Sequence, residues 1–166
     1  METVSMYSIC MFEQWSPTPG FLVWRLSMKW RAAVDRAVAP LGLTHAQYSV
    51  LASLFGMARA GERPSQRRLA DHTGLEPIYI SKLTRALQSA GLVERSVDPA
   101  DTRAVRLAPT DKGVEVAGLA ISAVRDLQEQ LTAPLGGTRG RRTRTLMREL
   151  EALLAQPVPP TKEQSE

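Results

Sequence analysis

The chain has 166 residues, a length that predicts one domain, because a single core usually divides only beyond roughly 250 residues. Hydrophobic residues make up 43% of the chain and charged residues 23%, which excludes a largely disordered protein. Twenty-one Lys and Arg against 17 Asp and Glu give a net charge of +4, which favours a polyanionic partner.

Cysteine and histidine are too few for a disulfide framework or a metal site. The chain has a single cysteine, Cys10, and its two histidines, His45 and His72, lie far apart in the sequence. We therefore expect no metal and no cofactor. We also find no nucleophile paired with a base and no glycine-rich phosphate loop, so an enzyme is not expected.

No segment has the features of a membrane helix or a signal peptide. No stretch approaches the roughly 18 apolar residues that a spanning helix needs. The uncharged stretch 3–12 follows Glu2 rather than a basic cluster, and no small-residue cleavage site follows it. We therefore expect a cytoplasmic protein without membrane contact.

The first half of the chain is predicted to be helical. Residues 1–20 form an N-terminal extension with Pro17, Pro19 and Gly20, and a helix follows from Phe21 to Val38. A second helix begins after Thr44, where Gln47 completes a capping box, and it is predicted to end at about Gly56.

A shorter pair of helices follows. Ser65 is the predicted N-cap of a helix over 66–73, and Gly74 supplies the left-handed residue that ends it. The next helix covers 77–90 and ends before Gly91. Its apolar side chains share one face and are predicted to point inward: Ile80, Leu83 and Leu87.

The period then changes from helix to strand. The segments 92–97 and 104–107 alternate like two strands, and the turn-forming residues 98–103 join them as the tip of a hairpin. Thr110 is the predicted N-cap of a helix of about six turns that stops before Pro134. An amphipathic helix covers 141–154, and the tail 155–166 is predicted to be disordered.

A short helix, a glycine turn, a second helix and a hairpin are the elements of a winged helix-turn-helix, so we predict a mainly α fold that binds double-stranded DNA. The second helix would enter the major groove, and the hairpin tip would reach the minor groove with Arg103 oriented by Asp101. The candidate DNA contacts are Ile78, Ser81, Lys82, Arg85, Arg95, Asp101, Arg103, Arg106, Arg67 and Arg68. Arg95 or Arg106 could instead form an ion pair with Glu94. Arg67 and Arg68 either contact a DNA phosphate or make no contact with DNA.

Several motifs in this order resemble the MarR family of bacterial winged-helix regulators. They are Gly42-Leu43-Thr44 with Gln47-Tyr48, Leu69-Ala70, Leu87 with Gly91-Leu92-Val93-Glu94-Arg95, Asp98-Pro99-Ala100-Asp101-Thr102-Arg103, and Leu107 with Thr110 and Gly113. The resemblance covers 21–154. It implies a homodimer on a pseudo-palindromic operator, with dimerisation helices at 21–42 and 110–154 and a DNA-binding lobe at 43–109.

The pattern of the terminal helices also predicts a dimer. They are amphipathic but too long for one small lobe to cover, so they need a partner surface. The densest basic run, Arg139, Arg141, Arg142 and Arg144, is placed by the resemblance at the dimerisation end. We therefore expect it to be solvated or to form salt bridges between subunits rather than to bind DNA.

The predicted function is a homodimeric repressor of a palindromic operator, released by a small aromatic or phenolic effector. By the resemblance, the effector would lie where the helices meet the lobe, at Trp24, Met28, His45 and Tyr48, although aromatic and Met side chains at helical spacing are more often core than pocket. One alternative is a redox-sensing regulator that uses Cys10. In the peroxide-responsive branch of the MarR family the sensor cysteine stands where this chain has Gly20, so Cys10 does not match that position. Another is a ligand-binding module that has lost DNA binding.

Overall fold

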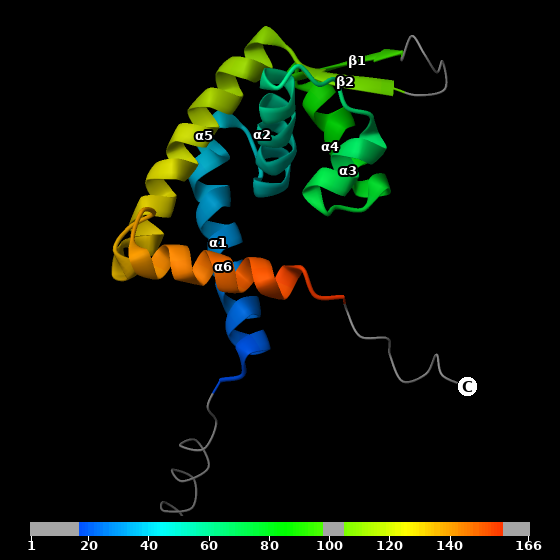
Figure 1. Cartoon of the computed structure of the whole chain (residues 1–166). Coiled ribbons are helices and arrows are strands. Elements are labelled where there is room, and N and C mark those ends of the chain that lie inside the picture. Colours follow the sequence, from blue (N-terminus) through cyan, green and yellow to red (C-terminus); the bar gives the residue numbers. More distant parts are fainter. Residues whose placement is uncertain (1–16, 98–104, 158–166) are drawn as a thin grey trace, which may run out of the picture.

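The computed structural model describes residues 17–97 and 105–157, and it confirms a mainly α winged helix-turn-helix (Figure 1). Its helices and strands are α1 (Pro19–Val38), η1 (Ala39–Leu41), α2 (His45–Arg59), α3 (Gln66–Thr73), α4 (Pro77–Ser89), β1 (Val93–Val97), β2 (Val105–Pro109), α5 (Asp111–Thr132), η2 (Ala133–Leu135) and α6 (Arg141–Leu154).

The predicted caps lie where the sequence places them. The side chains of Thr44, Ser65 and Thr110 each accept a hydrogen bond from an amide in the first turn of the helix that follows. Gly74 and Gly91 adopt positive φ angles of 68° and 71° just beyond α3 and α4. These ends are fixed by local chemistry, which is why the sequence predicts them.

Two helix boundaries differ from the prediction. α1 begins at Pro19, inside the predicted extension, because Thr18 caps it and proline suits a first helical position. α2 does not end near Gly56 but continues to Arg59, and the chain then turns at Gly61, whose φ is 81°. The continuation buries Met57 in the core, which offsets the low helix propensity of Gly56.

The core lies around α2, which packs against α4, the wing strand β2 and the middle of α5. Its largest fully buried side chains are Leu51 and Leu54 from α2, Leu69 from α3, Ile80 and Leu87 from α4, and Leu107 from β2. The predicted inward face of α4 is therefore confirmed. Val34 and Val38 join the same core from the last turns of α1.

The wing is paired on both edges of β2. β1 and β2 are antiparallel, and on its other side β2 bridges Ser65, while the amide of Leu107 donates to the carbonyl of Pro64 at 3.0 Å. The loop before α3 therefore acts as a third strand. Because Ser65 is also the N-cap of α3, the wing is joined directly to the helix-turn-helix.

The end of α4 is bonded directly to the start of α5. The hydroxyl of Thr110 donates to the carbonyl of Gly91 at 2.7 Å, and the Lys112 ammonium donates to the carbonyl of Ala90 at 3.1 Å. The amide of Thr110 donates to the carbonyl of Leu92 at 3.1 Å. Carbonyls that a helix end leaves unpaired are satisfied here by the next long helix.

The turn between α5 and α6 is closed by a carboxylate. Glu129 accepts hydrogen bonds from the hydroxyl and the amide of Thr138, at 2.5 and 3.0 Å. These bonds hold the pKa of the Glu129 carboxyl below its usual value. The buried Thr143 hydroxyl also donates to the carbonyl of Gly137, so the direction of α6 is set by this turn.

We predict that Gly113→Ala lowers the free energy of unfolding by roughly 1–3 kcal/mol. A Cβ at Gly113 would overlap the carbonyl oxygen of Leu92 and lie 2.9 Å from its carbonyl carbon, and backbone cannot move aside as a side chain can. Urea unfolding at one protein concentration measures the effect. The matched control is Gly118→Ala in the same helix, where a Cβ meets open space and the change should stabilise by roughly 0.5–1 kcal/mol. Equal effects of the two substitutions would contradict the close approach.

Candidate nucleic-acid interface

The helix α4 has one face buried in the lobe. Ile80, Leu83, Thr84 and Leu87 form this face, and all four are buried. Thr84 was not singled out in the sequence, but its hydroxyl donates to the carbonyl of Ile80 at 2.9 Å and is therefore satisfied. The buried face holds α4 so that its opposite face points outward.

The opposite face of α4 carries the predicted base-reading residues. Ile78 is 84% exposed, Lys82 and Arg85 are also exposed, and Ser81 is half-buried. Their spacing of three, four and seven residues places them on one side of the helix. The structure therefore brings together two cationic donors, a hydroxyl and an apolar side chain, the groups that can read base edges in a major groove.

The two arginines of the wing that the structure describes lie on opposite faces of its sheet. Arg95 lies opposite the buried Leu107 in the strand register and is half-buried, whereas Arg106 lies opposite the exposed Ser96 on the other face of the sheet. The guanidinium of Arg106 donates to the carbonyl of Arg63 at 3.0 Å. Its neighbours in the hairpin tip, Asp101 and Arg103, lie outside the described residues.

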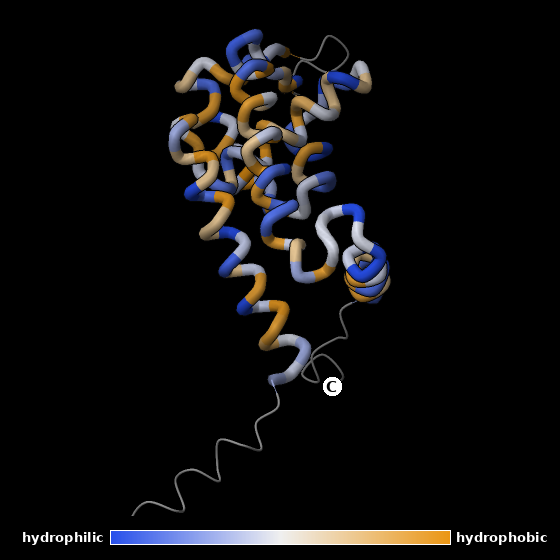
Figure 2. The backbone as a smooth tube through the Cα atoms, turned by 90° about the vertical axis from the view of Figure 1, so that its left-hand side faces the viewer, coloured by the Kyte–Doolittle hydropathy of each residue, from blue (hydrophilic) through white to orange (hydrophobic). Residues whose placement is uncertain are grey.

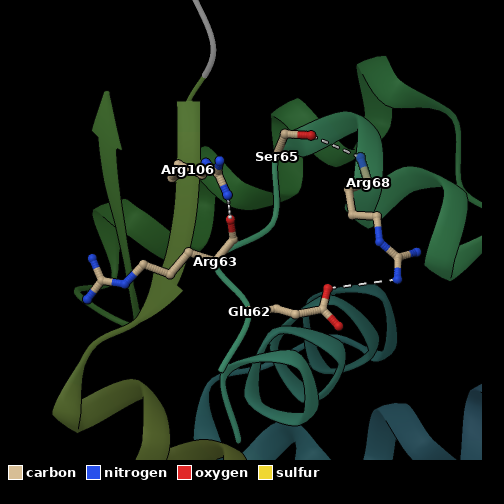
Figure 3. Close-up of polar contacts among 5 residues, drawn as sticks. All are labelled: Glu62, Arg63, Ser65, Arg68 and Arg106. Carbon is tan, nitrogen blue, oxygen red and sulfur yellow. Dashed lines mark hydrogen bonds and ion pairs between the residues drawn. The ribbon is translucent and has the colours of Figure 1, made fainter. Parts of the chain in front are cut away.

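The start of α3 adds basic side chains next to the wing (Figure 3). Ser65 accepts a hydrogen bond from the amide of Arg68 at 3.2 Å, and the Arg68 guanidinium lies 3.8 Å from the carboxylate of Glu62. Arg67 is exposed one residue earlier. Because both partners of the Arg68 pair are about half exposed, the pair contributes little to stability and leaves Arg68 able to meet a phosphate.

Two further residues belong to this surface and were missed in the sequence. Arg63 lies beside the wing, 3.9 Å from Glu94, so the carboxylate considered as a partner for Arg95 or Arg106 is paired with Arg63. Tyr79 is 38% exposed in the first turn of α4. The signal for Arg63 is its place in the basic group that also contains Arg67 and Arg68.

The four predicted effector residues do not meet in one pocket within this chain. His45 and Tyr48 are half-buried at the start of α2, whereas Trp24 and Met28 are 57% and 51% exposed on α1. Burial raises the pKa of the Tyr48 hydroxyl, so it stays neutral and can donate a hydrogen bond. A residue that sequence reasoning missed, Asp35, accepts a hydrogen bond from the amide of His45 at 2.5 Å.

A surface hollow of about 430 Å³ lies elsewhere, beside the second half of α2. None of the four predicted effector residues lines it, but His72 does. The lining residues are Ala52, Ser53, Gly56, Met57, Ala60, Glu62 and His72.

The arginine-rich start of α6 lies at the end of α5 away from the wing (Figure 1). The guanidinium of Arg142 donates to the carbonyl of Pro134 at 3.3 Å, and that of Arg144 donates to the carbonyl of Arg139. At least part of this basic run therefore closes the turn before α6.

The comparisons with known proteins identify the class and then the family. Residues 43–113 match the family described as "Winged helix DNA-binding domain", which covers α2 through the first turn of α5. The chain thus contains a winged-helix DNA-binding module.

Three similar proteins extend the match to nearly the whole described chain. The uncharacterized HTH-type transcriptional regulator YdcH of Bacillus subtilis is 34% identical over 116 residues, which are 70% of this chain and 79% of YdcH. CouR from Rhodococcus jostii RHA1, solved with p-coumaroyl-CoA, is 30% identical with a TM-score of 0.69, over 86% of this chain and 94% of CouR. A mutant MarR from E. coli, solved with operator DNA, is 26% identical with a TM-score of 0.72, over 81% of this chain and 92% of MarR.

The chain belongs to the MarR family of winged helix-turn-helix transcriptional regulators, which are DNA-binding proteins. In the part that the structure describes, no helix is both long and apolar enough to cross a membrane.

Proposed function

We propose that the chain is a homodimeric repressor that binds a pseudo-palindromic operator and is released by a small aromatic or phenolic molecule. The observation that carries the proposal is the outer face of α4. There Lys82 and Arg85 stand exposed beside Ile78, on a helix whose other face is held by the core. A major groove accepts one such helix, with Lys or Arg reading guanine and an apolar group touching a thymine methyl.

The surface around α4 supplies contacts to the DNA backbone. Arg67 and Arg68 lie in the first turn of α3, Arg106 lies on β2 near the hairpin tip, and the carbonyl of Arg63 accepts a hydrogen bond from the Arg106 guanidinium. Residues 63–106 hold eight basic and five acidic residues, a net charge of only +3. The placement of the cations, more than their number, therefore supports DNA binding.

Uncovered apolar surface on the terminal helices supports a homodimer. α6 packs mainly on η2 within the described chain, and Leu146, Met147, Leu153 and Leu154 are left exposed. The first turns of α1 project from the lobe with Phe21, Leu22, Val23, Trp24 and Leu26 exposed, and Figure 2 marks hydrophobic stretches along this arm. A second copy offers the same faces and can cover both.

The dimensions of α5 suit an operator with two half-sites. Its 22 residues span about 33 Å, close to the roughly 34–36 Å between successive major grooves on one side of DNA. Two lobes held at the ends of such helices could therefore contact two grooves at once.

An effector site between the arm and the lobe is suggested by the stripe that Trp24 and Met28 form on α1. The ligand of CouR, p-coumaroyl-CoA, carries a phenolic ring, and a similar ring could stack on the indole of Trp24 in the dimer. A ligand that prefers the lobe spacing unable to bind DNA by about 100-fold shifts the equilibrium by about 2.7 kcal/mol.

We predict that Lys82→Ala and Arg85→Ala each weaken binding to the DNA upstream of the encoding gene by about 5- to 150-fold, because one good base contact contributes about 1–3 kcal/mol. Binding to scrambled DNA should change little. Arg103→Ala should weaken binding to both DNAs. Fluorescence anisotropy at 50 and 200 mM salt measures these affinities.

The control for this experiment is Arg141→Ala, which removes the same charge from the start of α6 and should leave both affinities within about twofold. Wild-type affinity should fall by about 10³-fold or more between the two salt concentrations if six to ten phosphates are neutralised. If Arg141→Ala lost as much affinity as Arg85→Ala, the outer face of α4 would not be the specific DNA-binding surface, and the proposal would be contradicted.

We predict that the double substitution Leu146→Glu with Leu153→Glu converts the protein from two chains to one. Both side chains are exposed within a single chain, so the charges harm only a surface that a second copy covers. Sedimentation equilibrium measures the mass, and circular dichroism checks that the helices remain. Val97→Glu, at a wing position that is 61% exposed, should stay dimeric. A single-chain mass for the unaltered protein would refute the homodimer.

We predict that p-coumaroyl-CoA or p-coumarate lowers operator affinity by about 100-fold at saturation. Cyclohexanecarboxylate, a small carboxylate without an aromatic ring, should have no effect. Trp24→Ala should raise the concentration of aromatic acid required for half-maximal release, measured against the variant's own operator affinity without ligand. Equal release by the aromatic and the saturated acid would rule out recognition of the ring.

A further inference from the structure

The carboxylate of Asp35 joins α1, the dimer arm, to the DNA-binding lobe, residues 43–109. Asp35 lies one turn before the end of α1, and its oxygen accepts a hydrogen bond of 2.5 Å from the amide of His45, the first residue of α2. The bond is partly buried. Among the described residues, no other side-chain hydrogen bond connects α1 with α2.

The first turn of α2 is built to receive this carboxylate. Thr44 already accepts the amide of Gln47 at 3.3 Å, and the Gln47 side chain accepts the amide of Thr44 at 2.9 Å. The amide of His45 is left over by this capping box, and Asp35 accepts it from another helix. A negative charge at the positive end of a helix strengthens the bond.

The other contacts at this junction are less directional. Val34 and Val38 pack into the core next to α2, and apolar packing permits small rotations and shifts of one helix against another. A short hydrogen bond to a backbone amide at a helix end instead fixes one point of α1 against the first residue of α2. The link between the helices is only η1 and the three residues 42–44, so this point lies at the pivot.

We propose that Asp35 is a positioning residue for operator binding: it fixes the start of α2 on the dimer arm and thereby sets the separation and angle of the two lobes. The proposal rests on the proposed function, since it requires a dimer on two half-sites. Asp35 itself touches no DNA in this scheme. Its loss should therefore affect binding to two half-sites together and leave binding to one half-site unchanged.

The structure offers a substitution that removes only the donor of this bond. His45→Pro takes away the amide hydrogen, and proline is favourable at a first helical position. The preceding residue, Thr44, has φ −88° and ψ 163°, the extended conformation that a residue before proline prefers. The matched control is His45→Ala, which removes the same imidazole and keeps the amide.

The test compares the full operator with a DNA that contains one half-site, by anisotropy, for the dimeric full-length protein. His45→Pro and Asp35→Ala should lose about tenfold or more in affinity for the full operator and less than about twofold for the half-site. His45→Ala should bind both DNAs like the unaltered protein. Asp35→Asn, whose amide oxygen can still accept the bond, should recover most of the affinity for the full operator.

Three results would overturn the proposal. Binding of His45→Pro to the full operator as tightly as His45→Ala would show that the hydrogen bond does not position the lobes. An equal loss on both DNAs for His45→Pro and Asp35→Ala would show that the bond supports the fold of the lobe instead. If the unaltered dimer bound full operator and half-site equally well, the proposed function would itself fail, and the positioning role would fail with it.

Discussion

The hydrogen bonds between the end of α4 and the start of α5 are the constraint on which the rest of the molecule depends. Thr110 and Lys112 satisfy the carbonyls of Gly91 and Ala90, and Gly113 allows the backbone of α5 to approach Leu92 closely. A helix end leaves carbonyls without hydrogen-bond donors. At the end of α4 the donors come from the start of α5, the long helix that leads to α6. The outer face of α4 therefore keeps a fixed orientation relative to α5.

The cations of the chain fall into two groups with different surroundings. Around α4 and the wing they are spread out, and Arg63 and Arg68 each lie near a carboxylate at almost 4 Å, at exposed positions where such pairs are weak. At the start of α6 they are denser, but Arg142 and Arg144 donate to backbone carbonyls of their own turn. Charge density alone would have selected α6 for DNA, whereas the helix that the core holds outward is α4.

Local chemistry was readable from the sequence, and contacts between distant segments were not. A cap involves residues three or four apart, so Thr44, Ser65 and Thr110 could be predicted, as could the outer face of α4. The end of α2 was predicted wrongly at Gly56, because low helix propensity can be read from the sequence alone. The burial of Met57, which favours continuation of the helix, depends on contacts with distant segments. The bond from Arg106 to the carbonyl of Arg63 spans 43 residues, and that from His45 to Asp35 spans ten. No periodicity or spacing reveals either of them.

The lobe is attached to long helices at both of its ends. Its first helix, α2, is bonded to α1 through Asp35 and His45, and its outward-facing helix, α4, is bonded to α5 through Thr110 and Gly91. Between these two attachments, β2 pairs with the loop before α3, so the lobe has little freedom to deform internally. Because the lobe is bonded to both α1 and α5, these helices can change their relative position only if one of the two attachments gives way, since a packed core shifts as a unit rather than bends.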